Sequence, residues 1–497
     1  MSAALAVELD DIQGLVRFGY KHHTEAAFLL LRIRDGGVDA ARRWLATVAV
    51  STAATVEPLP ETALQVAFTS DGLRALGVAD TVVEGFANEF VVGMGRDANR
   101  ARRLGDAGAN DPARWQWGAE PRVPHVLLLL YAMPGRLAAW QAAIEVQCAA
   151  GFELLTCLAT SDLDGIEPFG FTDGISQPLL DWERRRPARD AEHSAYTNLS
   201  CLGEYLLGYP NEYGGYTDRP LLDAAPSTAS LPRAEDEPTR ADLGRNGSYL
   251  VLRQLRQDVH GFWQFIDRQA GGDATRRERI ASAMVGRGRD GVPLVAKTGE
   301  AIEGGDAPGG LNAFTYRFDP HGARCPLGAH VRRSNPRNAD LPAGPPGLLS
   351  WAKRTLGFDA EALDLDLVAS TRFHRLLRRG REYGAGVSVS QAIAEPGGGA
   401  EPGLHFICLG ANLARQFEFV QNAWAMGIHF DGLPSESDPL LGTRLPAADG
   451  APSDGFSVQR ADGPAERIAG LPQFVTVLGG AYFFLPGIRA LRYLATR

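Results

Sequence analysis

Four segments that each join a short apolar run to an amphipathic one constrain the fold of this 497-residue chain most strongly. An apolar run of strand length followed by a 3.6-residue hydrophobic period predicts a strand that leads into a helix. Two such units lie in each half of the chain, in the same order, which indicates a weak internal duplication. The predicted strand and helix pairs are 26–33 with 38–48, 125–131 with 137–148, 247–255 with 259–269, and 404–409 with 413–426.

The duplicated pattern predicts the fold class. Two strand–helix units with added strands, such as the one predicted at 63–69, form a split βαβ or ferredoxin-like domain. We therefore expect an α+β protein of two ferredoxin-like halves, of the dimeric α+β barrel type, with antiparallel sheets flanked by helices. The N-terminal half is expected at 1–200 and the C-terminal half at 246–497, with a connecting and covering loop at 201–245.

Two long stretches of the chain are predicted to be irregular. The stretch 181–245 is rich in Pro, Gly, Asn and Tyr, and its aromatic residues favour an ordered loop that covers the core. The stretch 271–326 is rich in Gly, Asp and Arg and is expected to be more mobile. Loops this long in a compact chain usually carry function or are disordered.

Composition and charge narrow the range of partners. The formal net charge of −9 argues against nucleic-acid binding, which needs a basic face. No apolar run has the length of a transmembrane helix, and the first eleven residues lack the pattern of a signal peptide. The five cysteines are an odd, widely spaced set without a CxxC pair, as suits reduced thiols. A cytoplasmic protein without membrane or nucleic-acid partners is therefore expected, and a homo-oligomer is compatible with the sequence.

Two common classes of enzyme lack support in the sequence. A GxSxG nucleophile elbow and a P-loop are both absent. The letters GxGxxG occur at 286–291, but they follow a helix-like segment instead of the strand that a dinucleotide site requires.

The stretch 170–178, with the sequence GFTDGISQP, places the carboxylate of Asp173 in a turn between glycines. Glycine lets the backbone come close to a ligand because it has no Cβ atom. A buried carboxylate in such a turn is costly unless it is paired or takes part in chemistry. Taken alone, the stretch also fits a structural turn residue.

Two basic segments could serve an anionic ligand. His330 is followed by Arg332 and Arg333, and a planar anionic cofactor would need one nitrogen ligand and cations for its carboxylates. The segment 373–384 contains four arginines, including Arg378, and a permanently charged guanidinium suits a place where negative charge develops. Each segment also has a simpler interpretation. His330 could be a surface residue in a basic loop, and the arginines of 373–384 could form a face exposed to solvent.

Together, these segments resemble the dye-decolourising peroxidases, a family that binds haem b. The family's fold is the same duplicated ferredoxin-like pattern. The matching segments follow the family's order over nearly the whole chain: 11–14 (DIQG), 170–178, the AHVRRSNPR run around His330, the RRGREYG run around Arg378, and 403–424.

The resemblance implies a role for each matching residue. Asp173 corresponds to the family's distal acid–base carboxylate and Arg378 to its distal arginine. His330 corresponds to the proximal ligand of the haem iron. Leu404 and Phe406 fall where apolar residues line the distal pocket.

Three further residues are implied around the cofactor. Glu418 falls where the family places an acidic partner of the proximal imidazole, and either Arg332 or Arg333 would contact a haem propionate. One haem b per chain is implied, in the C-terminal half.

The implied activity is the reduction of hydrogen peroxide coupled to one-electron oxidation of dyes, phenols or other small aromatic donors. An alternative is a protein that binds haem or porphyrin for haem handling or iron release, with incidental peroxidase activity. A non-haem binding module of the same fold class is a third hypothesis.

Overall fold

The computed structural model describes residues 6–185, 198–297, 309–337, 370–399, 401–447 and 450–496. Within these ranges, every helix is too short or too polar to span a lipid bilayer.

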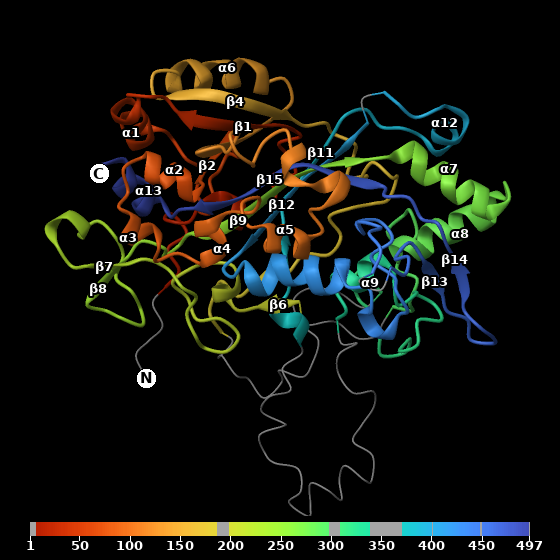
Figure 1. Cartoon of the computed structure of the whole chain (residues 1–497). Helices are drawn as coiled ribbons and strands as arrows, with labels where there is room; N and C mark the ends of the chain where they lie inside the picture. Colours follow the sequence, from red (N-terminus) through yellow and green to blue (C-terminus); the bar gives the residue numbers. More distant parts are fainter. Residues whose placement is uncertain are drawn as a thin grey trace, which may run out of the picture.

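A nine-stranded antiparallel sheet forms the centre of the described chain (Figure 1). Strands from the N-terminal part of the chain lie side by side in one half of the sheet, and strands from the C-terminal part fill the other half. From one edge to the other, the order is β10 (Leu377–Arg378), β12 (Gly403–Gly410), β9 (Ser248–Gln257), β15 (Val475–Leu485), β2 (Thr62–Phe68), β3 (Val126–Ala132), β1 (Glu25–Ile33) and β4 (Phe152–Ala159), with β11 (Arg381–Tyr383) also paired to β12.

The two groups of strands meet at β2 and β15, where Phe68 is paired with Phe484. The predicted α+β class, with antiparallel halves flanked by helices, is confirmed. The described strands form an open sheet and no closed barrel, since β10 and β4 lie at opposite ends of the strand order. The proposed boundaries at 200 and 245 stay a prediction.

The loop that follows β4 reaches the far end of the same sheet. The backbone N–H of Ser161 donates a hydrogen bond of 2.8 Å to the carbonyl of Glu382 in β11. This contact brings the segment that contains Asp173 beside β10, β11 and β12. Residues from the two parts of the chain can therefore share one site.

The continuous apolar runs arise because the sheet is buried on both faces. Successive side chains of a strand point to opposite faces of the sheet. A strand with one face in solvent therefore alternates apolar and polar residues, whereas a strand with both faces buried is apolar throughout. In β3, Leu128 and Leu130 join one hydrophobic cluster, while Leu127 and Leu129 join the other. Helices α1 (Val38–Thr47), α6 (Leu137–Cys148) and α13 (Ile488–Ala495) cover the first face, and buried residues of the loop 202–209 pack on the second.

The first three predicted helices are confirmed as α1, α6 and α7 (Val259–Ala270), while the fourth has an unexpected form. The region predicted as a helix at 413–426 is wound as two π-helical segments, η7 (Ala414–Glu418) and η8 (Val420–Met426). π-Helices are rare and occur often at functional sites. The remaining described helices of at least four residues are α2 (Ser70–Ala75), α3 (Asp80–Val83), α4 (Asn88–Val92), α5 (Ala98–Leu104), α8 (Ala274–Val285), α9 (His330–Ser334) and α12 (Val389–Ala394).

The helix α8 corrects the prediction that 271–326 is irregular throughout. Asp273 caps its first turn by accepting a hydrogen bond of 2.6 Å from the backbone N–H of Arg276. Ile280, Ala281 and Met284 bury the inner side of the helix. The arginines on the outer side obscure its hydrophobic period in the sequence.

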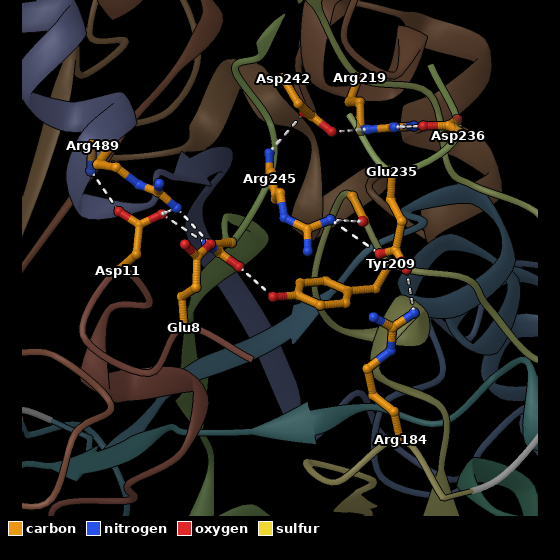
Figure 2. A network of polar contacts seen from close by, with 12 residues as sticks. Glu8, Asp11, Arg184, Tyr209, Arg219, Glu235, Asp236, Asp242, Arg245 and Arg489 are labelled. Carbon is orange, nitrogen blue, oxygen red and sulfur yellow. Dashed lines mark hydrogen bonds and ion pairs between the residues drawn. The ribbon is translucent and has the colours of Figure 1, made fainter. Parts of the chain in front are cut away.

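A network of polar contacts joins the chain ends to the loop 201–245 (Figure 2). Asp11 accepts hydrogen bonds from the amide of Asn246 (2.7 Å) and from the backbone N–H of Arg489 (2.7 Å). The guanidinium of Arg489 also contacts Asp11 (3.0 Å), and Tyr209 donates to the side-chain oxygen of Asn246 (2.6 Å). Further along, the buried Arg219 and Asp242 form an ion pair. The network thus fixes the covering loop to both ends of the described chain.

We expect Asp11→Ala to lower the free energy of unfolding by about 1–3 kcal/mol, because the buried amide of Asn246 and the backbone N–H of Arg489 lose their hydrogen bonds to its carboxylate. Equilibrium unfolding in urea measures this change. Asp80→Ala is the matched control, since the Asp80 side chain is 72% exposed in its ion pair with Arg74. The control should change the stability by less than about 1 kcal/mol. Equal losses in the two variants would contradict a structural role for the network.

Candidate active site

A cavity of about 290 Å³ is lined by residues from both parts of the chain. Asp173, His330, Arg378, Leu404 and Phe406 all line it. They come from the loop after β4, from α9, from β10 and from β12, so the fold brings together residues that are widely separated in the sequence. The π-helical segment η8 adds a further wall.

Asp173 and Arg378 form an ion pair in the wall of the cavity, with Oδ1 and Nη1 2.9 Å apart. The flanking Gly170 and Gly174 have φ values of 95° and 72°, which side chains with a Cβ rarely adopt. The same loop is tied to β10 by two more hydrogen bonds: Arg378 donates from Nη2 to the carbonyl of Ser176 (3.1 Å) and from its backbone N–H to Gln177 (3.0 Å). The arginine therefore holds the carboxylate and its loop together.

The pKa of Asp173 is lowered from its ordinary value of 3.8. Burial raises this pKa, but the positive charge of Arg378 and the backbone N–H of Gly174 outweigh it. Asp173 is consequently an ionised carboxylate near neutral pH, able to accept a proton.

His330 faces the cavity with its other side anchored on a carboxylate that the sequence analysis did not identify. Its Nδ1 donates to Oδ2 of Asp438 at 2.9 Å, and the Asp438 side chain is 1% exposed. Oδ1 of Asp438 accepts from the backbone N–H groups of Leu440 and Leu441, both at 2.9 Å. This arrangement fixes the imidazole and leaves Nε2 for a ligand in the cavity.

The charges of this pair depend on each other. Burial raises the pKa of Asp438, but His330, Arg333 and the N–H of Leu441 together lower it to about 2. Burial lowers the pKa of His330, whereas Asp438 raises it above 6.5. The charges of the ion pair also affect the pKa of His330, which Arg378 lowers and Asp173 raises.

The prediction that Glu418 is the acidic partner of His330 is wrong. Oε1 of Glu418 contacts Nε of Arg100 at 2.9 Å and accepts from the hydroxyl of Tyr482 at 2.9 Å. Asp438 takes the predicted place. It follows His330 by 108 positions, in a loop without any periodic or motif signal, so the sequence offered no means of finding it.

Arg332 and Arg333 lie outside the cavity lining, so the prediction that one of them contacts a cofactor carboxylate has no support in the structure. Both are buried and bind backbone carbonyls. Arg332 donates to the carbonyls of Asp319 and Cys325, both at 3.0 Å. Arg333 donates to the carbonyl of Trp424 at 2.8 Å, among others. They hold the loops around α9 in place.

Other arginines line the cavity instead, and the donor set fits a planar anionic cofactor. Nη1 of Arg287 donates to two carbonyls, while its Nη2 is buried without a hydrogen-bond partner among the described residues. Burial and the neighbouring Arg337 lower the pKa of Arg287 to about 10, so a bound carboxylate would be stabilised here. The arginines that line the cavity are Arg253, Arg287, Arg337, Arg375 and Arg378.

Comparison with known proteins identifies the family, although no family model matches the chain. The multifunctional dye peroxidase DyP2 of Amycolatopsis sp. is 31% identical over 399 residues, which are 77% of this chain and 74% of the relative. The dye-decolorizing peroxidase AauDyP1 of Auricularia auricula-judae is 27% identical over 517 residues, 98% of this chain and 87% of the relative.

Solved structures share the fold. A fungal DyP-type peroxidase from Auricularia auricula-judae superposes with a TM-score of 0.72 at 24% identity, covering 99% of this chain and 100% of that one. A DyP-type peroxidase from Anabaena sp. has a TM-score of 0.68 at 22% identity, covering 98% and 94%. The extent of the match to DyP2 shows that this chain belongs to the family of dye-decolourising peroxidases, which are haem enzymes.

Proposed function

We propose that this peroxidase binds one haem b in the cavity and couples the reduction of hydrogen peroxide to one-electron oxidation of dyes, phenols or other aromatic donors. One observation carries the proposal: the His330–Asp438 pair and the Asp173–Arg378 pair line the same cavity. Haem b supplies the redox chemistry when bound.

On the proximal side, His330 would bind the iron through Nε2. The carboxylate of Asp438 holds the proton on Nδ1, fixes the tautomer and makes the imidazole a stronger electron donor. Arg287 and Arg337 would bind the propionates in place of the residues suggested by the sequence. Leu404 and Phe406 would exclude water from the distal side.

On the distal side, Asp173 would take the proton from one oxygen of hydrogen peroxide and return it to the other oxygen as the O–O bond breaks. Arg378 would stabilise the negative charge on the departing oxygen. The proton is returned to the leaving group, so Asp173 is ionised again for the next turnover.

The choice of donor rests on the relatives. A dye-decolorizing peroxidase has been solved as a complex with 2,6-dimethoxyphenol, and phenolic donors are proposed for this chain by similarity. A cytoplasmic location also stays a prediction, which the free state of all five cysteines supports.

We expect the reaction with peroxide to persist at mildly acidic pH, because the folded-state pKa of Asp173 is lowered by Arg378. The ionised carboxylate is lost only as the pH falls through that lowered pKa, well below the value near 6.5 where a distal histidine would titrate. Arg378→Leu removes the positive charge, so the acid limb should move to higher pH. Rate constants for peroxide reduction measured between pH 3 and 7 test this, and an unchanged limb in the variant would contradict it.

The proposed function is tested by adding peroxide and an anthraquinone dye to the haem-loaded protein. We expect an intense Soret band and bleaching of the dye that needs both protein and peroxide. A purified protein that takes up no haem, or whose haem gives no more turnover than free haem, would contradict the proposal.

A further inference from the structure

The loop that carries Asp173 is folded around the side chain of a second carboxylate, Glu167. The backbone forms a narrow hairpin, in which Glu167 N–H donates to the carbonyl of Phe171 (2.9 Å) and Asp173 N–H donates to the carbonyl of Gly165 (3.0 Å). The Glu167 carboxylate closes the tip of this hairpin. Its Oε2 accepts from Phe169 N–H and its Oε1 from Phe171 N–H, both at 3.0 Å.

The same carboxylate ties the hairpin to the sheet. Nε2 of Gln257, the last residue of β9, donates to Oε2 of Glu167 at 2.8 Å. β9 is paired with β12, which carries Leu404 and Phe406. Glu167 therefore connects the loop that positions Asp173 to the strands that form the apolar side of the cavity.

Glu167 lines the cavity, but its carboxylate oxygens are occupied by hydrogen bonds from the hairpin and from β9. Its three hydrogen-bond partners are all neutral N–H donors, and it forms no ion pair among the described residues. The pKa of Glu167 is raised to about 7, because burial and the negative charge of Asp173 outweigh the three donors, which lower it. Burying a carboxylate without an ion pair costs free energy. The three hydrogen bonds that it accepts at the edge of the cavity offset this cost and point to a structural role.

We propose that Glu167 is a positioning residue for Asp173, which fixes the hairpin 165–173 so that the Asp173 carboxylate is presented to peroxide. The inference rests on the proposed function, because it assumes that Asp173 transfers the proton. Glu167 itself acts through the backbone of the loop.

Glu167→Gln tests the proposal, because an amide has one oxygen and its NH₂ group would face either Phe171 N–H or the Phe169 and Gln257 donors. We expect the rate constant for reaction with hydrogen peroxide to fall by about 10- to 100-fold, as displacements of about 1 Å can cause. The Soret band and the Michaelis constant for the dye should stay unchanged. In the haem-loaded protein, hydrogen exchange at the amides of Phe169 and Phe171 should become faster.

Glu278→Gln is the matched control. Glu278 contacts Arg289 at 3.6 Å, and Arg289 donates to the carbonyl of Gly170 in the same loop. The control removes a nearby negative charge but leaves the hydrogen bonds of Glu167 in place. Its peroxide reaction and hydrogen exchange should match those of the unaltered protein.

The double variant Asp173→Asn/Glu167→Gln separates positioning from an independent effect. If Glu167 acts only through Asp173, adding Glu167→Gln to Asp173→Asn changes the rate by less than about twofold. Losses that multiply in the double variant would overturn the proposal. So would a Glu167→Gln rate equal to that of the Glu278→Gln control.

A substitute variant and a comparison between single variants complete the test. Should Glu167→Gln fail to fold, Glu167→Asp keeps the charge but shortens the reach, and a normal peroxide rate with normal exchange in that variant would overturn the proposal. A full rate in Asp173→Asn alone would refute the proposed function, whereas a slow Asp173→Asn with a normal Glu167→Gln would refute only the positioning role.

Discussion

Replacing Asp173 with asparagine is expected to slow the reaction of the haem-loaded protein with hydrogen peroxide by about 10²- to 10⁴-fold, the usual contribution of a positioned acid–base group. The amide has nearly the same shape but cannot accept the peroxide proton. Stopped-flow absorbance at the Soret band measures the rate constant. Haem content should be unchanged, because His330 is anchored on Asp438 and not on Asp173.

Asp164→Asn is the control for this experiment. Asp164 is exposed in the same loop and has a φ of 56°, a conformation that asparagine adopts readily. It should react with peroxide at the normal rate. If Asp173→Asn keeps the full rate while binding haem, the alternative of a haem-handling protein with incidental peroxidase activity would be favoured instead.

Asp438→Asn is expected to slow peroxide reduction by about 10- to 100-fold, as is typical when the hydrogen-bond partner of a metal-binding histidine is changed. Asp438 accepts from His330 with one oxygen and from Leu440 and Leu441 with the other. Asparagine has one oxygen, so its NH₂ group must face one of these donors. The loss of negative charge should also raise the reduction potential of the iron, which a spectroelectrochemical titration measures.

Glu418→Gln makes this test specific, since the sequence resemblance pointed to Glu418 and the structure points to Asp438. Glu418 contacts Arg100 and Tyr482, so its replacement should affect stability but leave the reduction potential unchanged. A shifted potential in Glu418→Gln, with a normal one in Asp438→Asn, would show that the assignment of the proximal carboxylate is wrong.

The parts of the fold that the sequence predicted are those with local signals. Each of the four strand–helix units has a strand run that is mostly apolar, because the central strands of the sheet are buried on both faces. The strand β15 was not predicted, since Gly479 and Gly480 interrupt its pattern. The structure explains these glycines: a Cβ atom on Gly479 would lie 2.6 Å from Trp117, and the register of β15 shifts at this point.

The site shows the same division between local and distant signals. Asp173, His330 and Arg378, which line one cavity, could be proposed from the sequence because each lies in a short distinctive run. Asp438 was missed because its contact with His330 joins helix α9 to a loop 108 positions further along the chain. The sequence suggested Arg332 or Arg333 for a cofactor carboxylate because a basic pair beside a proposed ligand histidine looks the same whether it binds a cofactor or, as here, the backbone carbonyls of neighbouring segments.

A crystal structure of the haem-loaded protein tests the central claim most directly. We predict one haem per chain in the cavity, with its iron bound to Nε2 of His330 and with Asp173 and Arg378 on the opposite face. Iron bound by another residue, or a haem that leaves Asp173 and His330 on the same face, would contradict the account.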